Sequence, residues 1–195
     1  MSVLSSSFKP FKPIKMSNAF ELSVADTMVE NNLKLKEVVG DGNCFFASLV
    51  ICLAALGTKT SITALRQKFS AHLAARVDEL APFFAVAEDD QRTEYHEEDS
   101  DEGNEQGSRA SREFLAAVKK IRQSRFWDNQ IIDLVVGCAT EVLCAHVSIF
   151  DIDQEGNITE YQHLYEPEEE KVWPTINLLR QDDNHFNAFV AVDDK

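Results

Sequence analysis

The sequence predicts an α+β fold in which helices come first and strands follow, and three observations indicate it. The chain has 195 residues, about one domain and enough to bury a sizeable core. The stretch 43–56 is apolar on all sides, as expected of a buried central helix. After residue 142, short segments rich in β-branched and aromatic residues lie between turn residues. We therefore expect a small, largely antiparallel sheet packed against helices, with the 43–56 helix between them.

The elements follow from hydrophobic periodicity and from turn residues along the chain. Residues 1–30 are expected to form a flexible N-terminal segment with a short helix near 19–28, and residues 31–195 the folded domain. A charged stretch at about 88–108 has no periodicity and is expected to be an acidic surface loop. The remaining expected elements are a strand at 33–39, helices at 43–56, from Thr60 or Ser61 to a break at Pro82, from Ser111 and at 130–141, and strands at 143–150, 158–165, 175–180 and 185–192.

The net charge of the chain limits the classes of partner that it can bind. The formal net charge is −14, and residues 88–105 carry ten acidic residues and one Arg, hence −9 of that total. Such a balance argues against a nucleic-acid partner. The simplest interpretation of the acidic stretch is a solvated loop, and the mildly acidic remainder suits a basic partner.

The cysteines indicate a reducing compartment, and the hydropathy gives no sign of a membrane segment. The four cysteines lack the paired spacing of a disulfide framework or a metal site, and no run reaches transmembrane length or forms a secretory signal. We expect a cytoplasmic protein with no cofactor, no metal and no membrane contact. His96 lies among acidic residues, but no second nitrogen or sulfur ligand is spaced to complete a site with it.

The first candidate site is the stretch 40–46, Gly-Asp-Gly-Asn-Cys-Phe-Phe. Asp41 and Asn43 are N-cap types, so Cys44 is expected at a helix N-terminus after a tight turn. There the helix dipole lowers a thiol pKa and favours a nucleophilic thiolate. The backbone N–H groups of Asp41, Gly42, Asn43 and Cys44 are candidates for an oxyanion hole. The alternative is that Cys44 is a small buried hydrophobe, as Cys52, Cys138 and Cys144 are expected to be.

The second candidate site is the C-terminal strand, where His185 and Asn187 share one face because side chains alternate. An amide two residues from a histidine can hold it in the right tautomer, and an early Cys with a late His is the order expected of a cysteine hydrolase. Asp182 and Asp183 are lower-ranked alternatives to Asn187. His146 is a rival base without an amide or carboxylate two residues on, and His72 is expected on a helix flank.

Together the two stretches resemble the OTU (ovarian tumour) family of cysteine deubiquitinases. The motifs that carry the resemblance are Asp41-Gly42-Asn43-Cys44-Phe45-Phe46 and His185-Phe186-Asn187, and it extends from about residue 33 to 192. Trp127-Asp128, an apolar helix and Val147-Ser148-Ile149 match the family's order, and Ile176-Asn177-Leu178-Leu179 resembles its penultimate strand. Asp128-Asn129 replaces two glycines of the family, which puts that turn in doubt but not the chemistry.

The resemblance implies a thiol protease that cleaves isopeptide bonds after the C-terminal tail of ubiquitin. Cys44 would be the nucleophile, His185 the base and Asn187 its orienter, an amide third member being sufficient in papain-like proteases. Asp41 would contribute mainly by holding the turn before Cys44, and to a smaller extent through its negative charge.

The expected partners are ubiquitin, polyubiquitin chains or ubiquitin-like modifiers, bound by a monomer. In a pathogen the chain would be a host-directed effector acting in host cytosol. Two alternatives remain open: another cysteine hydrolase of transglutaminase-like or amidase type, and a catalytically drifted ubiquitin-binding module.

Overall fold

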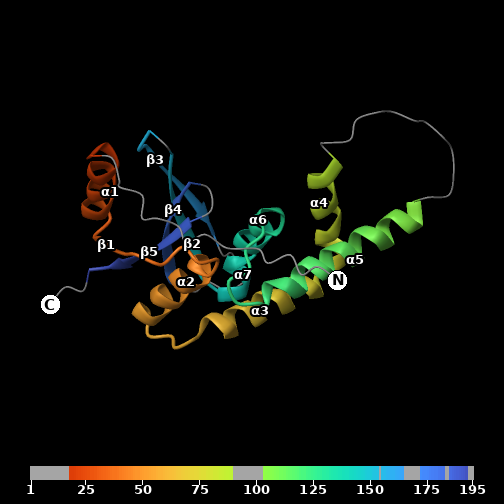
Figure 1. The fold of residues 1–195 in the computed structure, drawn as a ribbon. Helices are drawn as coiled ribbons and strands as arrows, with labels where there is room; N and C mark the ends of the chain where they lie inside the picture. The colour runs from red at the N-terminus through yellow and green to blue at the C-terminus, as the bar shows by residue number, and fades with distance from the viewer. Residues whose placement is uncertain (1–17, 90–102, 154, 165–171, 183–184, 193–195) are drawn as a thin grey trace, which may run out of the picture.

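The computed structural model describes residues 18–89, 103–153, 155–164, 172–182 and 185–192, which form an α+β fold (Figure 1). Helices dominate the first two thirds of the chain and strands the last third, as predicted. The elements are α1 Asn18–Glu30, β1 Leu33–Lys36, α2 Cys44–Ala55, α3 Ile62–Ala75, α4 Val77–Asp89, α5 Gly103–Ile121, α6 Asn129–Gly137, α7 Ala139–Leu143, β2 His146–Ile152, β3 Ile158–His163, β4 Thr175–Gln181 and β5 His185–Ala191.

The five strands form one sheet in the order β1-β5-β4-β2-β3. The pair β2 and β4 is parallel and the other three pairs are antiparallel, so the expected largely antiparallel sheet is confirmed. The first residue of β5, His185, lies opposite the last residue of β4, Gln181. This end of the sheet is where the N-terminus of α2 arrives.

Each face of the sheet has its own apolar core. Phe186, Ala188 and Val190 of β5 belong to the core that includes α2. Phe189 points to the other face, where Val24 of α1 is buried with it. Figure 1 shows α1 and the paired helices α4 and α5 on opposite sides of the strands. Val24 of α1 therefore packs with the folded unit, within the N-terminal segment 1–30 in which we expected a short helix.

The long helix expected from Ser61 to Pro82 is two helices. Ser61 caps α3 as predicted, since its hydroxyl accepts a hydrogen bond from the N–H of Ala64 at 3.2 Å. The chain leaves the helix at Arg76, whose guanidinium binds Glu79 and Glu141. Pro82 lies inside α4, in its second turn, where the missing N–H removes one helical hydrogen bond without ending the helix.

Two further boundaries differ from the prediction. The expected 130–141 helix breaks at Cys138, and Cys144 ends α7 in the left-handed conformation with φ 50°, so β2 begins at His146 rather than 143. The stretch 88–108, expected to be an acidic loop, overlaps two helices at its ends, because α4 runs to Asp89 and α5 begins at Gly103. Residues 90–102, with His96, lie outside the described residues.

The described residues contain neither a candidate membrane-spanning helix nor a candidate metal cluster. None of the described helices combines the length and the apolarity that a membrane crossing requires. Among the described residues, no three His, Cys, Asp or Glu side chains are grouped as a metal ion would need.

Candidate active site

The cysteine turn places Cys44 at the first position of α2, with its side chain 3% exposed. Asp41 closes the turn, because its Oδ1 accepts the N–H of Asn43 at 3.0 Å. Gly42 has φ +79°, a conformation that an L side chain rarely adopts. Asn43 occupies the N-cap position but its side chain does not cap the helix. Cys44 therefore begins a helix after a tight turn, as predicted, but Asn43 does not cap that helix and Asp41 closes the turn instead.

The turn uses two of the four backbone N–H groups that the sequence suggested for an oxyanion hole. Asp41 donates its N–H to the carbonyl of Val39 at 3.0 Å, and Asn43 donates to Asp41 Oδ1. An N–H group bonded in this way is not directed at a substrate oxygen. The N–H groups of Asp41 and Asn43 are thus engaged within the turn, and the oxyanion hole formed by the backbone of residues 41–44 stays a prediction.

Asn187 is held on β5 by two hydrogen bonds besides the one to His185. Its side chain is 4% exposed, its Oδ1 accepts the N–H of Val38 at 2.8 Å, and its Nδ2 donates to Gln181 Oε1 at 2.6 Å. The hydrogen bond between Asn187 and His185 raises the pKa of the imidazole. These partners define the amide orientation, with the carbonyl oxygen toward β1 and the nitrogen toward β4.

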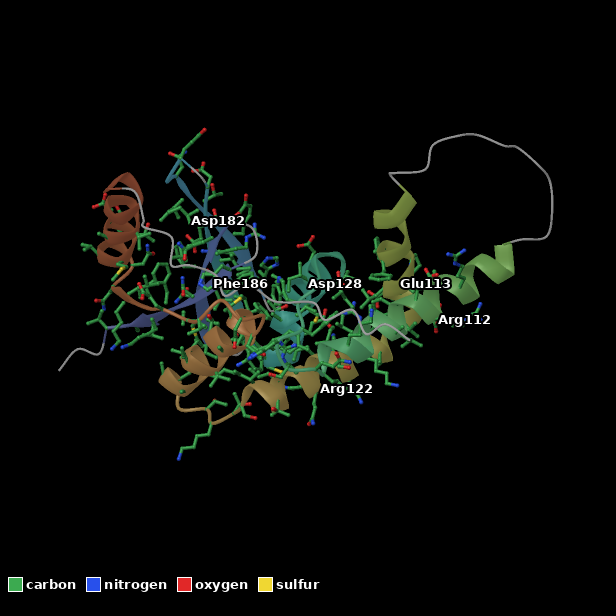
Figure 2. All side chains as sticks on the ribbon, in the orientation of Figure 1. Arg112, Glu113, Arg122, Asp128, Asp182 and Phe186 are labelled. Carbon is green, nitrogen blue, oxygen red and sulfur yellow. The ribbon has the colours of Figure 1, made fainter. Side chains whose placement is uncertain are left out.

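The structure brings the cysteine helix onto the start of the histidine strand. Ser48 Oγ donates to the carbonyl of Phe186 at 3.1 Å, and the rings of Phe45 and Phe186 pack edge to face at 5.2 Å. Cys44 is hydrogen bonded by the backbone of Phe186, the neighbour of His185. Figure 2 shows Phe186 in the body of the molecule and Asp182 toward the β4–β5 turn.

Glycine at position 40 makes room for the imidazole. A Cβ on Gly40 would lie 3.3 Å from His185 Nδ1, tighter than an ordinary contact. The chain therefore runs past the histidine immediately before it enters the cysteine turn. This contact adds a second link between the two motifs that lie far apart in the sequence.

The pKa values of the two reactive groups move in opposite directions. Burial raises the pKa of the Cys44 thiol, with a smaller upward contribution from the charge of Asp41, and backbone hydrogen bonds from Phe186 and Phe45 only partly offset it. Burial lowers the pKa of His185. The lowered thiol pKa expected from the helix N-terminus is therefore wrong for the unliganded protein, because desolvation outweighs the helix terminus. Both shifts favour the neutral form of the side chain, the thiol of Cys44 and the imidazole of His185.

The other candidate residues lie elsewhere or act indirectly. His146 lies opposite Thr175, at the other end of β4 from Gln181, so it is at the far end of the sheet from His185. His72 contacts Glu141 at 3.1 Å, between α3 and α7. Asp182 is exposed in the β4–β5 turn and only its charge affects His185. Asp183 lies outside the described residues.

Sequence reasoning missed two residues that contact the site. Gln181 binds the Asn187 amide, and its only sequence signal was its place directly after the strand predicted at 175–180. Arg66 of α3 is 1% exposed and donates to the carbonyl of Gly42 at 2.6 Å. Its signal was a charged residue three positions before Phe69, on the flank of the apolar stripe of a helix.

Comparisons with known proteins identify the fold. No protein-family model matches the sequence, and no curated protein is detectably similar to it. Among solved structures, the chain is similar to the OTU domain of OTUD1, with a TM-score of 0.58 and 17% identity over 88% of this chain and 94% of that one.

Two viral structures agree with this result. The Hazara virus OTU, solved bound to ubiquitin, matches with a TM-score of 0.53 and 14% identity over 85% of each chain. The OTU domain protease from Farallon virus matches with a TM-score of 0.52 and 14% identity over 83% of this chain and 85% of that one. The chain therefore has the α+β fold of the OTU domains.

Proposed function

We propose that this chain is a thiol-dependent deubiquitinase that hydrolyses isopeptide bonds after the C-terminal tail of ubiquitin or a ubiquitin-like modifier. The observation that carries the proposal is the meeting of Cys44, at the start of α2, with the β5 strand that bears His185 and Asn187. The OTU fold supports it, and the similar Hazara virus OTU was solved bound to ubiquitin.

The mechanism begins from the neutral pair. As the thiol sulfur attacks the carbonyl carbon at the end of the modifier's tail, the imidazole of His185 takes the proton of Cys44 Sγ. Asn187 holds the imidazole through their hydrogen bond, and its own orientation is fixed by Val38 and Gln181. The N–H groups of Gly42 and Cys44 are the donors for the oxyanion of the tetrahedral intermediate.

The second half of the reaction returns the groups to their starting state. The imidazolium of His185 gives its proton to the leaving lysine amine as the carbon–nitrogen bond breaks, leaving a thioester on Cys44. A water molecule then attacks the thioester while His185 takes its proton. The carbon–sulfur bond breaks, the proton on His185 returns to Cys44 Sγ, and the modifier leaves as a carboxylic acid that gives its proton to solvent. No redox or metal step is needed.

The test is covalent capture. The protein is incubated with ubiquitin that carries a C-terminal electrophile, and the product is measured by intact mass spectrometry for wild type and Cys44→Ala. We expect one adduct on Cys44 and none on the variant, and peptide mapping distinguishes Cys44 from the exposed Cys144.

The alternatives give different results in the same experiment. A folded wild type that binds ubiquitin without forming an adduct would be a binding module. A protein with neither adduct nor binding, but with an alkylatable Cys44, would direct the search to other cysteine hydrolases. After a positive result, a panel of ubiquitin-like probes and diubiquitin linkages would identify the substrate.

A further inference from the structure

Arg66 is a buried cation directly beneath the cysteine turn. Its side chain projects from α3, its residue is 1% exposed, and its guanidinium carbon lies 4.4 Å above the centre of the Phe46 ring. An arginine remains charged even in such a place, and a buried charge is costly unless hydrogen bonds compensate it. Its position therefore calls for an explanation beyond core packing.

The guanidinium joins three separate segments through its fork of donors. Nη2 donates to the carbonyl of Gly42 at 2.6 Å and to Asn43 Oδ1 at 3.0 Å. Nη1 donates to the carbonyl of Ile121 at 2.7 Å, and both nitrogens contact the carbonyl of Phe126, at 3.1 and 3.2 Å. One side chain thus links the cysteine turn to the end of α5 and to the segment that follows it.

The same segment contacts the cysteine turn from its other side. The N–H of Arg125 donates to Asn43 Oδ1 at 2.9 Å, so this oxygen accepts from both arginines. A Cβ on Gly42 would lie 2.3 Å from the carbonyl oxygen of Arg125, which explains why glycine is required there. The cysteine turn is therefore held by contacts from both arginines, and Arg66 binds two of its acceptors, the carbonyl of Gly42 and Asn43 Oδ1.

The atoms that Arg66 binds determine which part of the cysteine turn it holds in place. The Gly42 carbonyl belongs to the peptide between Gly42 and Asn43. The N–H groups of Gly42 and Cys44, the candidates for the oxyanion hole, belong to the peptides on either side. Fixing the central peptide and the Asn43 side chain therefore fixes both donors.

We propose that Arg66 is a positioning residue for catalysis, which holds the Gly42–Asn43 peptide so that the N–H groups of Gly42 and Cys44 converge on the oxyanion. This inference rests on the proposed hydrolase function. Burial lowers the pKa of Arg66, and the negative charge of the neighbouring Asp41 partly offsets this effect.

Lysine would not replace this arginine. An ammonium group is a point charge without the planar fork, so it can keep the positive charge but not bridge Gly42, Asn43 and Phe126 together. Arg66→Lys therefore separates geometry from charge, and Arg66→Met removes both. The control is Arg76→Met, because Arg76 also binds two acceptor residues, Glu79 and Glu141, and neither lies in the cysteine turn.

The experiment measures kcat and KM on a fluorogenic C-terminal amide of ubiquitin, together with the rate of Cys44 alkylation by iodoacetamide. Alkylation needs the thiol but forms no oxyanion. For Arg66→Lys we expect kcat to fall about 100-fold, the effect of a misplacement near 1 Å, while KM and alkylation change about twofold or less. Arg76→Met is expected to lose stability and keep kcat.

Four results would contradict the inference about Arg66. A folded Arg66→Lys with wild-type kcat overturns the inference, and so does a fall in alkylation equal to the fall in kcat. If both Arg66 variants fail to fold by circular dichroism, Asn43→Ala removes one acceptor while Arg66 stays in place, and an unchanged kcat in that variant overturns the inference. A wild type that alkylates but does not hydrolyse the amide overturns the proposed function, and this inference with it.

Discussion

At the scale of single residues, the chemistry that we propose for the site depends on two pKa shifts in opposite directions. Burial raises the pKa of the Cys44 thiol and lowers the pKa of the His185 imidazole. Both shifts favour the neutral side chains over a thiolate–imidazolium pair. In the proposed mechanism the proton therefore moves during attack, and we expect the base to be essential rather than auxiliary.

The pH dependence of activity follows from the direction of these shifts. His185 must be neutral to accept the proton, and its pKa is lowered, so kcat/KM should rise with pH and reach half its maximum below about pH 6.5, the ordinary histidine value. In His185→Ala, alkylation of Cys44 should become appreciable only above about pH 8.5, because the thiol pKa is raised. Rate profiles with the fluorogenic amide and with iodoacetamide measure both. A half-maximum above pH 8 in wild type would instead mean that the thiol ionises without help.

The amide of Asn187 gives a second prediction for a single side chain. Asn187→Ala removes the proposed orienter of His185 and the acceptor for the partly buried N–H of Val38, so kcat should fall about 100-fold and the free energy of unfolding by about 1–3 kcal/mol. Gln181→Leu keeps Asn187 but removes the acceptor for its Nδ2, so a smaller loss of kcat is expected. The control is Gln162→Leu on the exposed edge strand β3. Equal kcat for Gln181→Leu and Gln162→Leu would contradict the role given to Gln181.

At the scale of elements, the docking of α2 on β5 decides whether the two motifs meet. The hydroxyl of Ser48 on the α2 side reaches the carbonyl of Phe186 in β5 and is completely buried. The thiol of Cys52 one turn later lies 3.4 Å from the carbonyl of Asn177 in β4. The helix is therefore held in register with the strands by polar contacts as well as by packing.

Ser48→Ala tests this docking against a matched serine. It leaves a buried carbonyl without its donor and should cost about 1–3 kcal/mol of stability and also lower kcat, since Cys44 lies one turn away. Ser70→Ala removes a similarly buried hydroxyl, which donates to the carbonyl of Val118 and accepts from Arg122 Nε, so it should cost at least as much stability with unchanged kcat. Urea denaturation and the fluorogenic assay measure the two quantities. A loss of kcat in both variants would show general destabilisation rather than docking.

The elements also show where sequence reasoning succeeds. The all-apolar α2 and the alternating β5 were predicted to within two residues, because periodicity reports directly on burial. The break between α3 and α4 was missed, since it depends on Arg76 and its contact with the distant Glu141. Arg66 was missed for the same reason. A charged residue on a helix is normally a surface residue, and only the approach of segments 42–43 and 121–126 makes it buried.

At the scale of the whole molecule, the fold has a second core that the motifs do not reveal. Phe189, Leu179 and Phe150 line the face of the sheet away from α2, and they are nearly inaccessible because Val24 and Met28 of α1 pack on them. No hydrophobic pattern in the first thirty residues was strong enough to predict this. The helix covers a face that would otherwise be apolar surface on one side of a five-stranded sheet.

Two truncations test the contribution of α1. Removal of residues 1–17 leaves α1 in place, and we expect the melting temperature to be unchanged. Removal of residues 1–30 exposes the second core. Burying one aliphatic side chain contributes about 1.5–3 kcal/mol, and about 1 kcal/mol corresponds to about 2–4 °C in a domain of this size, so a fall of several degrees is expected.

Val24→Asp should reproduce most of that loss in the full chain, because it places a charge in the same contact. Cys44 lies on the other core, so the shorter protein should still form the ubiquitin adduct at a temperature where it remains folded. Equal melting temperatures for the two truncations would mean that α1 contributes nothing to the folded unit, and that the domain begins at residue 31 after all.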